Sequence, residues 1–193
     1  MRSFIELSVV VFFGLTLGGL LAWFSIQNSN GFAALKVGQW TAWPLEGSIN
    51  ADPYSKAKVA ADGKVPLGAA EGLALHAKTD RRGDELLRNC QYRINGQTPP
   101  ARFWTLSAHE LNGDVLRRQS GSPSSIVSRS IIRSGDGSFD LQLGPKFAPQ
   151  NWLKTSGEGR FELILRLYNT PLTSTSGIVD TKMPAITLLG CTK

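Results

Sequence analysis

The chain has 193 residues, of which 41% are hydrophobic and 19% are charged, and its formal net charge is +6. This composition excludes a disordered or collagen-like chain, and the length allows one ordinary domain with a short appendage. The hydrophobic residues are unevenly distributed, because residues 7–26 include no charged residue. The remainder, roughly 160 residues, is long enough to bury a core of its own.

Residues 1–27 are predicted to form a transmembrane anchor. A helix of twenty apolar residues spans about 30 Å, the thickness of the hydrocarbon core of a bilayer. A cleaved signal peptide is the alternative, but its apolar region is usually about 7–15 residues long and ends at a small-x-small site. This run is longer and ends in Ala22-Trp23-Phe24-Ser25-Ile26, which favours an uncleaved anchor. Arg2 precedes the span and the next basic residue is Lys36, so a cytoplasmic N-terminus and an exported domain are expected.

Residues 28–50 are interpreted as a tether and approach segment. Within it, residues 40–44 are either a short strand or a membrane-proximal segment, since they alternate Trp with small residues. A short helix is predicted next, with Asp52 as its N-cap, Pro53 at its first position and Gly63 at its end.

Residues 51–193 are predicted to form a mostly β domain, an antiparallel β-sandwich with that one short helix. From residue 67 onward, apolar residues alternate with polar ones and turn residues recur every 8–15 positions. The predicted strands cover residues 73–77, 90–94, 102–108, 115–118, 126–132, 139–143, 161–167 and 185–189. The Asp136-Gly137 turn predicts that the strands 126–132 and 139–143 form a hairpin.

Two cysteines, Cys90 and Cys191, both lie in the part expected to be exported. In an oxidising compartment they would form one disulfide, and two unpaired thiols are the alternative. The two histidines, His76 and His109, have neither Cys-x-x-Cys nor His-x-x-x-His spacing to complete a metal site. We therefore expect no metal and no cofactor.

No catalytic signature stands out, which argues against an enzyme without deciding the question. The chain has no Gly-x-Ser-x-Gly elbow and no Gly-rich loop leading into a helix. A catalytic base could come from His76 or His109, but each is interpreted first as an ordinary strand residue. The carboxylates near strands are interpreted as solvent-facing charges; they are Glu71, Glu110, Asp140 and Glu162.

Basic residues are concentrated in the middle of the chain. Residues 78–133 contain ten basic and five acidic residues, which is +5 of the total +6. Behind a membrane anchor, this excess indicates an anionic lipid, a cell-wall polymer or a membrane-protein partner rather than nucleic acid. A solvated face without a partner is the alternative.

One pattern of Arg and aromatic residues occurs twice. Arg102 and Trp104 are two residues apart, as are Arg166 and Tyr168, so the two members of each pair share one face of a strand. In the second strand, the opposite face holds Phe161 and three leucines and is expected to be core. If the strands are neighbours, the four side chains would interleave as a cation–π ladder, either as a ligand or partner face or as a structural stack.

Several motifs in this order resemble the domain-of-unknown-function 1214 family. They are Asp52-Pro53-Tyr54, Pro66-Leu67-Gly68, Ala70-Glu71-Gly72, Cys90-Gln91-Tyr92-Arg93-Ile94, Pro99-Pro100-Ala101-Arg102-Phe103-Trp104-Thr105-Leu106, Asn151-Trp152-Leu153, Leu163-Ile164-Leu165-Arg166-Leu167-Tyr168 and Met183-Pro184-Ala185-Ile186. The resemblance covers residues 51–191 and implies a jelly-roll sandwich in a bacterial envelope protein. Such proteins often carry a companion domain, numbered 1254, upstream, where this chain has a single span. The family offers no catalytic residues to transfer.

These observations predict a single-pass protein of the bacterial inner membrane, with a cytoplasmic N-terminus and a periplasmic domain that acts as a binding or assembly module. One alternative is an envelope enzyme that acts on a glycan or ester in a cleft lined by Arg102, Trp104, Arg166 and Tyr168. Another is an accessory subunit of a larger membrane complex. Gly14 and Gly18 have the spacing that lets two helices approach closely, so the chain could form a homo-oligomer. The alternative is that these glycines face lipid and contact no second helix.

Overall fold

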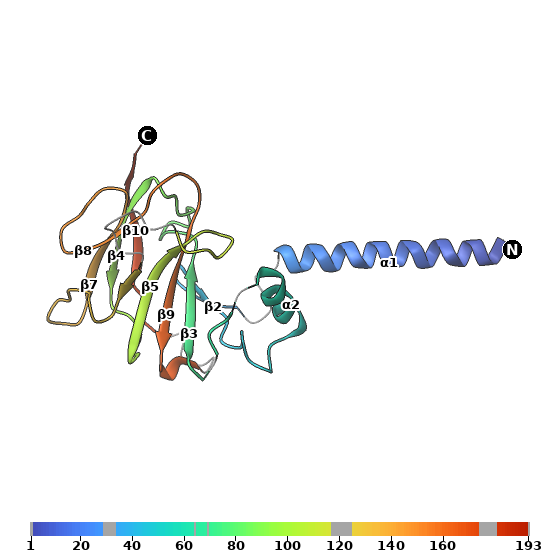
Figure 1. Ribbon diagram of the computed structural model, residues 1–193, viewed down its shortest axis with the longest axis horizontal. Helices are drawn as coiled ribbons and strands as arrows, with labels where there is room; N and C mark the ends of the chain where they lie inside the picture. The colour runs from blue at the N-terminus through green and yellow to red at the C-terminus, as the bar shows by residue number, and fades with distance from the viewer. Residues whose placement is uncertain are drawn as a thin grey trace.

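A long helix projects from a two-layered β domain, and a short helix lies between them (Figure 1). The computed structural model describes residues 2–28, 34–63, 65–68, 70–116, 125–173 and 181–192. The long helix is α1 (Arg2–Asn28) and the short one is α2 (Pro53–Asp62). A single turn of 3₁₀ helix, η1, covers Pro171–Thr173.

Helix α1 is apolar enough to cross a membrane. Its segment Ser3–Ser25 has a mean hydropathy of 2.1, and none of this segment is buried against the domain. The hydroxyl of Ser8 donates to the Phe4 carbonyl at 2.8 Å and that of Thr16 to the Phe12 carbonyl at 2.9 Å, so these polar groups are satisfied within the helix. An N-terminal helix of this kind is either a membrane anchor or a signal sequence.

Helix α2 begins and ends where the sequence predicts. The Asp52 carboxylate accepts hydrogen bonds from the backbone N–H groups of Tyr54 and Ser55, both at 3.0 Å. The Ser55 hydroxyl also donates to this carboxylate, which lowers the pKa of Asp52. Gly63 ends the helix with φ at 61°, in the left-handed region that glycine adopts without strain.

The strands form two sheets. Their bounds are β1 Leu35–Val37, β2 Trp40–Ala42, β3 Gly72–Ala77, β4 Cys90–Gly96, β5 Phe103–His109, β6 Ser125–Val127, β7 Phe139–Gly144, β8 Asn151–Lys154, β9 Glu162–Tyr168 and β10 Ala185–Cys191. The six-stranded sheet has the order β1-β2-β3-β9-β5-β6, and the four-stranded sheet has the order β10-β4-β7-β8. The mostly β, sandwich-like fold is confirmed.

One detail of the predicted sandwich needs correction. The strand pairs described are antiparallel except for β7 and β8, which are parallel, so the four-stranded sheet is mixed. In addition, β1 and β2 lie within residues 28–50, the segment interpreted as a tether and approach segment; β2 corresponds to the short strand that was one of the two alternatives for residues 40–44, and it pairs with β3. The six-stranded sheet therefore begins at Leu35, before the expected domain start at residue 51.

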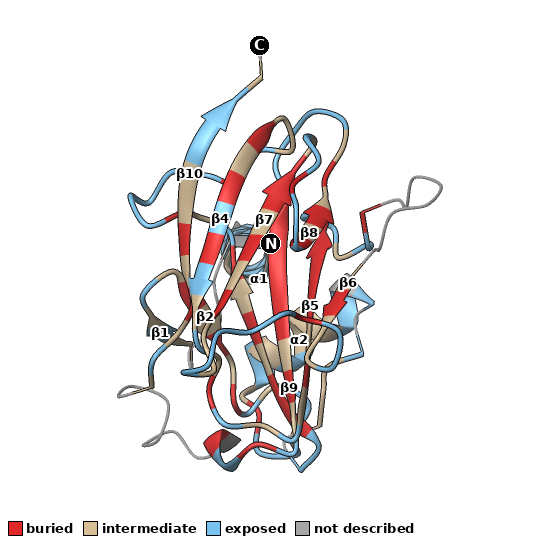
Figure 2. Ribbon diagram, turned by 90° about the vertical axis from the view of Figure 1, so that its left-hand side faces the viewer, coloured by how far each residue is buried: buried red, intermediate tan, exposed pale blue. Residues whose placement is uncertain are grey.

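The core lies between the two sheets (Figure 2). Alternate residues of β9 point inward together with Phe161, which directly precedes the strand; Phe161, Leu163, Leu165 and Leu167 are at most 1% exposed, as the sequence predicts. Leu141 of β7 and Ile94 of β4 contribute to the same core from the other sheet and are fully buried.

The hairpin predicted between residues 126–132 and 139–143 forms only at its tip, where Arg133 and Phe139 make an isolated antiparallel bridge. The Asp136-Gly137 turn forms, but β6 pairs with β5 in one sheet, whereas β7 belongs to the other. The Asn151 side chain explains the difference, because its amide accepts from the Ile132 N–H and donates to the Ile132 carbonyl, both at 2.8 Å. A side chain thus takes the place of a partner strand where the chain crosses between sheets. Of the strand predicted at 115–118, residues 117 and 118 lie outside the described residues.

The predicted disulfide between Cys90 and Cys191 is confirmed. The two residues are opposite one another in the pairing of β4 with β10, and their sulfur atoms are 2.02 Å apart. The bond ties the last residues of edge strand β10 to the second strand of its sheet.

Candidate functional site

Polar side chains gather on the outer face of the six-stranded sheet. The alternation that turns the leucines of β9 into the core turns Glu162 and Arg166 outward. The strand register places Glu162 opposite His109 of β5, and it places Ile164 between Ser107 of β5 and His76 of β3. Three adjacent strands thereby bring together titratable residues that are far apart in the sequence.

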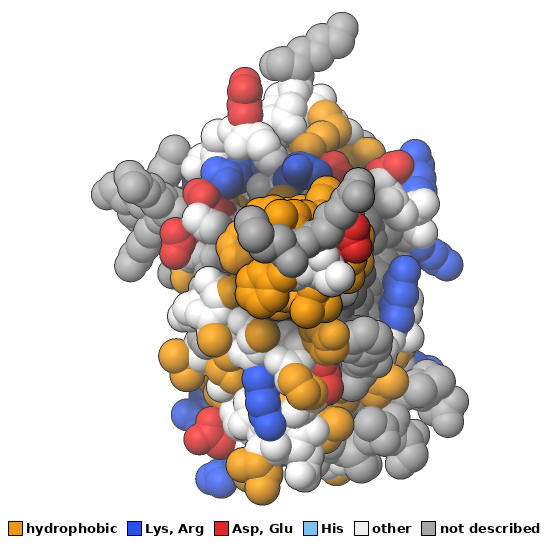
Figure 3. All heavy atoms as spheres, turned by 90° about the vertical axis from the view of Figure 1, so that its right-hand side faces the viewer, with side chains coloured by type: hydrophobic (Ala, Val, Ile, Leu, Met, Phe, Trp, Pro, Cys, Tyr) orange, Lys and Arg blue, Asp and Glu red, His pale blue; other side chains and the backbone are white. Residues whose placement is uncertain are grey.

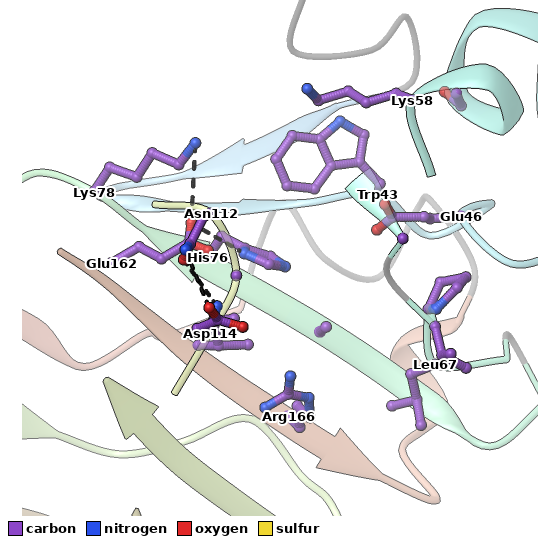
Figure 4. Close-up of a pocket in the computed structure, with 17 residues that line it drawn as sticks. Trp43, Glu46, Lys58, Leu67, His76, Lys78, Asn112, Asp114, Glu162 and Arg166 are labelled. Carbon is purple, nitrogen blue, oxygen red and sulfur yellow. Dashed lines mark hydrogen bonds and ion pairs between the residues drawn. The ribbon is translucent and has the colours of Figure 1, made fainter. Parts of the chain in front are cut away.

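The Glu162 carboxylate is the most deeply buried charged group of this face, at 2% exposed. His76 Nδ1 lies 3.5 Å from its Oε2 atom and Lys78 Nζ lies 3.9 Å from the same atom. A carboxylate buried this far is costly unless cations and hydrogen-bond donors compensate it. The His76 ring also makes an edge contact with Trp43, with the ring centroids 5.5 Å apart. Figure 4 shows Lys78, His76 and Glu162 gathered at one end of the site.

A chain of hydrogen bonds runs beside this cluster. Arg166 Nη1 donates to the Ser107 hydroxyl at 3.3 Å, and Ser107 Oγ lies 2.9 Å from His109 Nε2. His109 Nδ1 lies 2.9 Å from the Gly113 carbonyl oxygen, which can only accept, so the ring proton is at Nδ1. Nε2 of the neutral ring then accepts the Ser107 proton.

Burial lowers the pKa of His109, which is 4% exposed, and the positive charge of Arg166 lowers it further. The hydrogen bond to Gly113 and the charge of Glu162 act in the opposite direction but are outweighed. His109 is therefore neutral near pH 7, as the hydrogen-bond chain requires.

These strands form the floor of a cleft of about 320 Å³. One wall includes Trp43, Glu46 and helix α2, and the other is the turn at Asn112-Gly113-Asp114 after β5 (Figure 4). The charged side chains that line the cleft are Lys58, Lys78 and Arg166 on the positive side and Glu46, Asp114 and Glu162 on the negative side. The charges are balanced: Glu162 and Arg166 stand on β9, Lys78 directly follows β3, and the other three come from the two walls. Such an arrangement can orient a polar ligand that carries both signs.

The four residues expected to share one face do not do so. Strands β5 and β9 are neighbours, but the register pairs Trp104 with Leu167 and Phe103 with Tyr168. Trp104 therefore points into the core, where its ring centroid lies 5.6 Å from that of Phe139. The Arg133 guanidinium lies 5.5 Å from the centroid of the Trp104 ring.

Arg166 and Tyr168 point outward, and Tyr168 lies against Phe103 with ring centroids 5.8 Å apart. Arg102 is exposed at the residue before β5. The outward aromatic residue of β5 is thus Phe103 rather than Trp104. Of the four predicted residues, Arg166 alone lines the cleft.

From the sequence, three site residues were interpreted as ordinary strand residues or solvent-facing charges; they are His76, His109 and Glu162. One signal for Glu162 was available in the sequence of β9: a charged residue alternates there with the leucines of the core face and therefore lies on the opposite, outer face of the sheet. Among the residues that the structure describes, no group of three or more His, Cys, Asp or Glu side chains is placed to hold a metal ion.

The basic middle of the chain contributes little to the cleft. Arg88 pairs with Glu110 at 3.3 Å, and Arg93 pairs with Asp140 on the other sheet. Arg117 and Arg118 lie outside the described residues. Among the basic residues of this stretch that the structure describes, Lys78 lines the cleft. Arg88 and Arg93 are therefore held in local ion pairs away from the cleft.

Comparisons with known proteins identify a family and a fold. The family model of proteins of unknown function named DUF1214 matches residues 71–172. A crystal structure of the VPA0106 protein from Vibrio parahaemolyticus is similar, with a TM-score of 0.57 and 20% identity over 72% of this chain and 36% of that one. An uncharacterised protein from Burkholderia cenocepacia gives a TM-score of 0.44 and 16% identity over 65% of this chain and 31% of its own.

This chain thus spans only about a third of the length of either solved protein. No curated protein matches the sequence. The match to VPA0106 concerns the fold alone, whereas the family model covers just over half of the chain, including β3, β5 and β9. The chain belongs to the DUF1214 family of proteins of unknown function.

Proposed function

We propose that this protein is a membrane-tethered binding module of the bacterial cell envelope, and that the cleft between α2 and the six-stranded sheet is its ligand site. The observation that carries the proposal is the cleft itself, lined by three cations and three carboxylates. Its buried Glu162 is held between His76 and Lys78. Concave sites with a few convergent polar groups on a preformed scaffold are typical of ligand binding.

The location rests on two features. An N-terminal apolar helix, as anchor or signal, and a disulfide together indicate a secreted or envelope protein. We further propose that α1 stays uncleaved as a single span of the inner membrane, with its N-terminus in the cytoplasm and the β domain in the periplasm. The length of the apolar segment and the position of Arg2 support this orientation.

A photo-crosslinking amino acid in the cleft tests the proposal. Placed at Leu67, which lines the cleft, in the full chain in native membranes, it should yield an adduct of discrete mass after irradiation. The same group at Gln142, on β7 of the other sheet, should not. Adding Arg166→Met to the Leu67 variant should reduce the adduct about tenfold. Equal adducts at both positions, or none at Leu67, would contradict the proposal.

A second candidate function, ester hydrolysis, is favoured by the contact between Ser107 and His109. The Ser107 oxygen would attack the ester carbonyl and pass its proton to His109 Nε2, the alcohol would leave with that proton, and water would then release the acid. Ser107 is only 6% exposed, but Arg166, which donates to it, lines the cleft.

A fluorophosphonate probe distinguishes this alternative. A hydrolase would be labelled at Ser107, and labelling would disappear in Ser107→Ala but persist in Ser125→Ala, the paired residue on β6. A full chain that the probe does not label has no activated serine, which would remove the hydrolase candidate and leave the binding module.

A further inference from the structure

A second hollow lies against helix α2, next to the charged cleft. It has a volume of about 450 Å³ and lies between α2 and residues 46–51. Its lining includes the apolar side chains of Ala51, Val59 and Ala60. Glu46, Ser55 and Gly63 line both hollows, so the charged cleft and the apolar hollow adjoin one another around α2.

A ligand that fills both hollows must be amphiphilic. The cleft offers charged groups of both signs, and the hollow beside it offers mainly apolar surface. A wholly polar ligand would leave the apolar hollow against water, and a wholly apolar one would leave the cleft charges without a partner from the ligand. A lipid with a charged headgroup satisfies both parts.

The position of α2 brings this surface close to the membrane. Helix α1 ends at Asn28 and β1 begins at Leu35, seven residues later, a reach of at most about 25 Å even for an extended chain. Helix α2 contacts α1 and lies between it and the sandwich (Figure 1).

The face around α1 shows hydrophobic side chains with both basic and acidic side chains among them (Figure 3). Residues 45–65, which include α2, contribute exposed apolar groups, including Ile49 at 89% and Val65 at 96% exposed. Such a composition suits the headgroup region of a bilayer.

The charges of the cleft specify the headgroup. Lys58 and Arg166 are donors suited to a phosphate, and the carboxylate of Asp114, on the exposed turn after β5, is an acceptor suited to a primary ammonium. A choline group has no N–H to donate and is instead recognised by several aromatic faces, whereas Trp43 is the single aromatic residue among those described around the cleft. A headgroup without an ammonium would leave the Asp114 carboxylate facing phosphate.

We propose that the cleft binds a membrane phospholipid whose headgroup carries a phosphate and a primary ammonium, with an acyl chain lying in the apolar hollow against α2. This inference rests on the proposed function and names the ligand class of the same site. Anchored by α1, the site then lies at the surface of the bilayer that contains its ligand.

Photoactivatable phosphatidylethanolamine tests the inference. The full chain is reconstituted in phosphatidylcholine vesicles that contain a minor fraction of the photolipid, which carries its reactive group on an acyl chain. We expect labelled peptides from α2 and residues 43–51, in addition to the unavoidable labelling of α1. Val59→Asp in the hollow and Arg166→Met in the cleft should each lower the labelling of α2 about tenfold.

Ala61→Asp is the matched control, because Ala61 is exposed on the same helix and lines neither hollow. Circular dichroism confirms that each variant keeps its helices. The same experiment is repeated with photoactivatable phosphatidylcholine and with photoactivatable phosphatidylglycerol. Equal labelling of α2 in Val59→Asp and Ala61→Asp, or labelling by either of these photolipids that equals that by phosphatidylethanolamine, would overturn the inference. If the crosslinker at Leu67 still captures a non-lipid molecule, the binding function stands and the lipid assignment fails; if it captures nothing, both fail.

Discussion

Reduction of the disulfide should destabilise the β domain by several kcal/mol. The bond between Cys90 and Cys191 joins residues 101 positions apart. In the chain-entropy description, closing a loop of this length restricts the unfolded chain by about 4.7 kcal/mol. Because domains of this size are stable by only about 5–15 kcal/mol, reduction would remove a large share of the total.

Urea unfolding of the full chain in lipid nanodiscs, with and without reductant, measures this effect. The fluorescence of the buried Trp40 and Trp104 follows the β domain, since α1 stays in the lipid. With a urea dependence of about 1–3 kcal/mol per M, the midpoint should fall by about 2 M on reduction. The double variant Cys90→Ala/Cys191→Ala should unfold near the reduced midpoint and should not respond to reductant.

The result that would refute this reasoning is a shift below about 1 kcal/mol with the wild-type bond intact before reduction. It would mean that the bond constrains only the end of β10. That strand has other attachments, because Ile186 is fully buried and the Trp40 indole donates to the Pro184 carbonyl at 2.8 Å. Because these contacts are themselves lost on unfolding, a small shift would indicate that the reduced, unfolded chain keeps residual structure that already restricts it.

Three further predictions concern single residues. The pKa of His109 is lowered in the folded state, so as the pH falls the unfolded chain binds a proton before the folded chain does. The free energy of unfolding, measured by urea titration, should therefore fall below pH 6.5 by up to about 1.4 kcal/mol per pH unit. The fall should be smaller in His109→Gln. Gly72→Ala should cost about 3 kcal/mol in the same assay, because its Cβ would collide with the backbone oxygen of Leu167, whereas Gly135→Ala, with open space around it, should be neutral. Tyr92→Phe removes the hydroxyl that accepts the Leu87 N–H at 2.8 Å and should lower the unfolding free energy by about 1–2 kcal/mol; an unchanged midpoint would show that water replaces it.

The sequence was sufficient for those features that local chemistry determines. The caps of α2 follow from Asp52 and Gly63, and the inward face of β9 follows from its apolar alternation. The disulfide could be predicted because the chain has only two cysteines. Each of these needs either neighbouring residues or a single possible partner.

Other features depend on contacts that no local pattern encodes. After β6 the chain leaves the six-stranded sheet and enters the other sheet at β7. At this crossing the Asn151 side chain, many residues later in the sequence, binds the backbone of Ile132. The predicted face of Arg and aromatic residues depended on the parity of β5, in which Trp104 points inward and Phe103 outward. A shift of one residue in parity moves every side chain to the other face, so the cleft residues could not be assembled from spacing alone.

The cleft is lined by residues from two segments that were assigned to different parts of the chain, the tether and the β domain. The segment 28–50 was interpreted as a tether, yet it supplies β1, β2 and the wall at Trp43 and Glu46. The family model begins at residue 71, after α2. The site thus combines the sheet of the family domain with a wall contributed by the preceding segment, which is the segment nearest to α1.

Hydrogen exchange of the full chain in nanodiscs tests most directly that this cleft is a site for a lipid headgroup. Amide exchange is compared between nanodiscs of phosphatidylethanolamine mixed with phosphatidylcholine and nanodiscs of phosphatidylcholine alone. We predict that the ethanolamine lipid slows exchange in residues 43–51, in α2 and at residues 110–114, while β7 and β8 on the other sheet are unchanged. Identical exchange in both lipids at the cleft, or a uniform change over both sheets, would contradict the account.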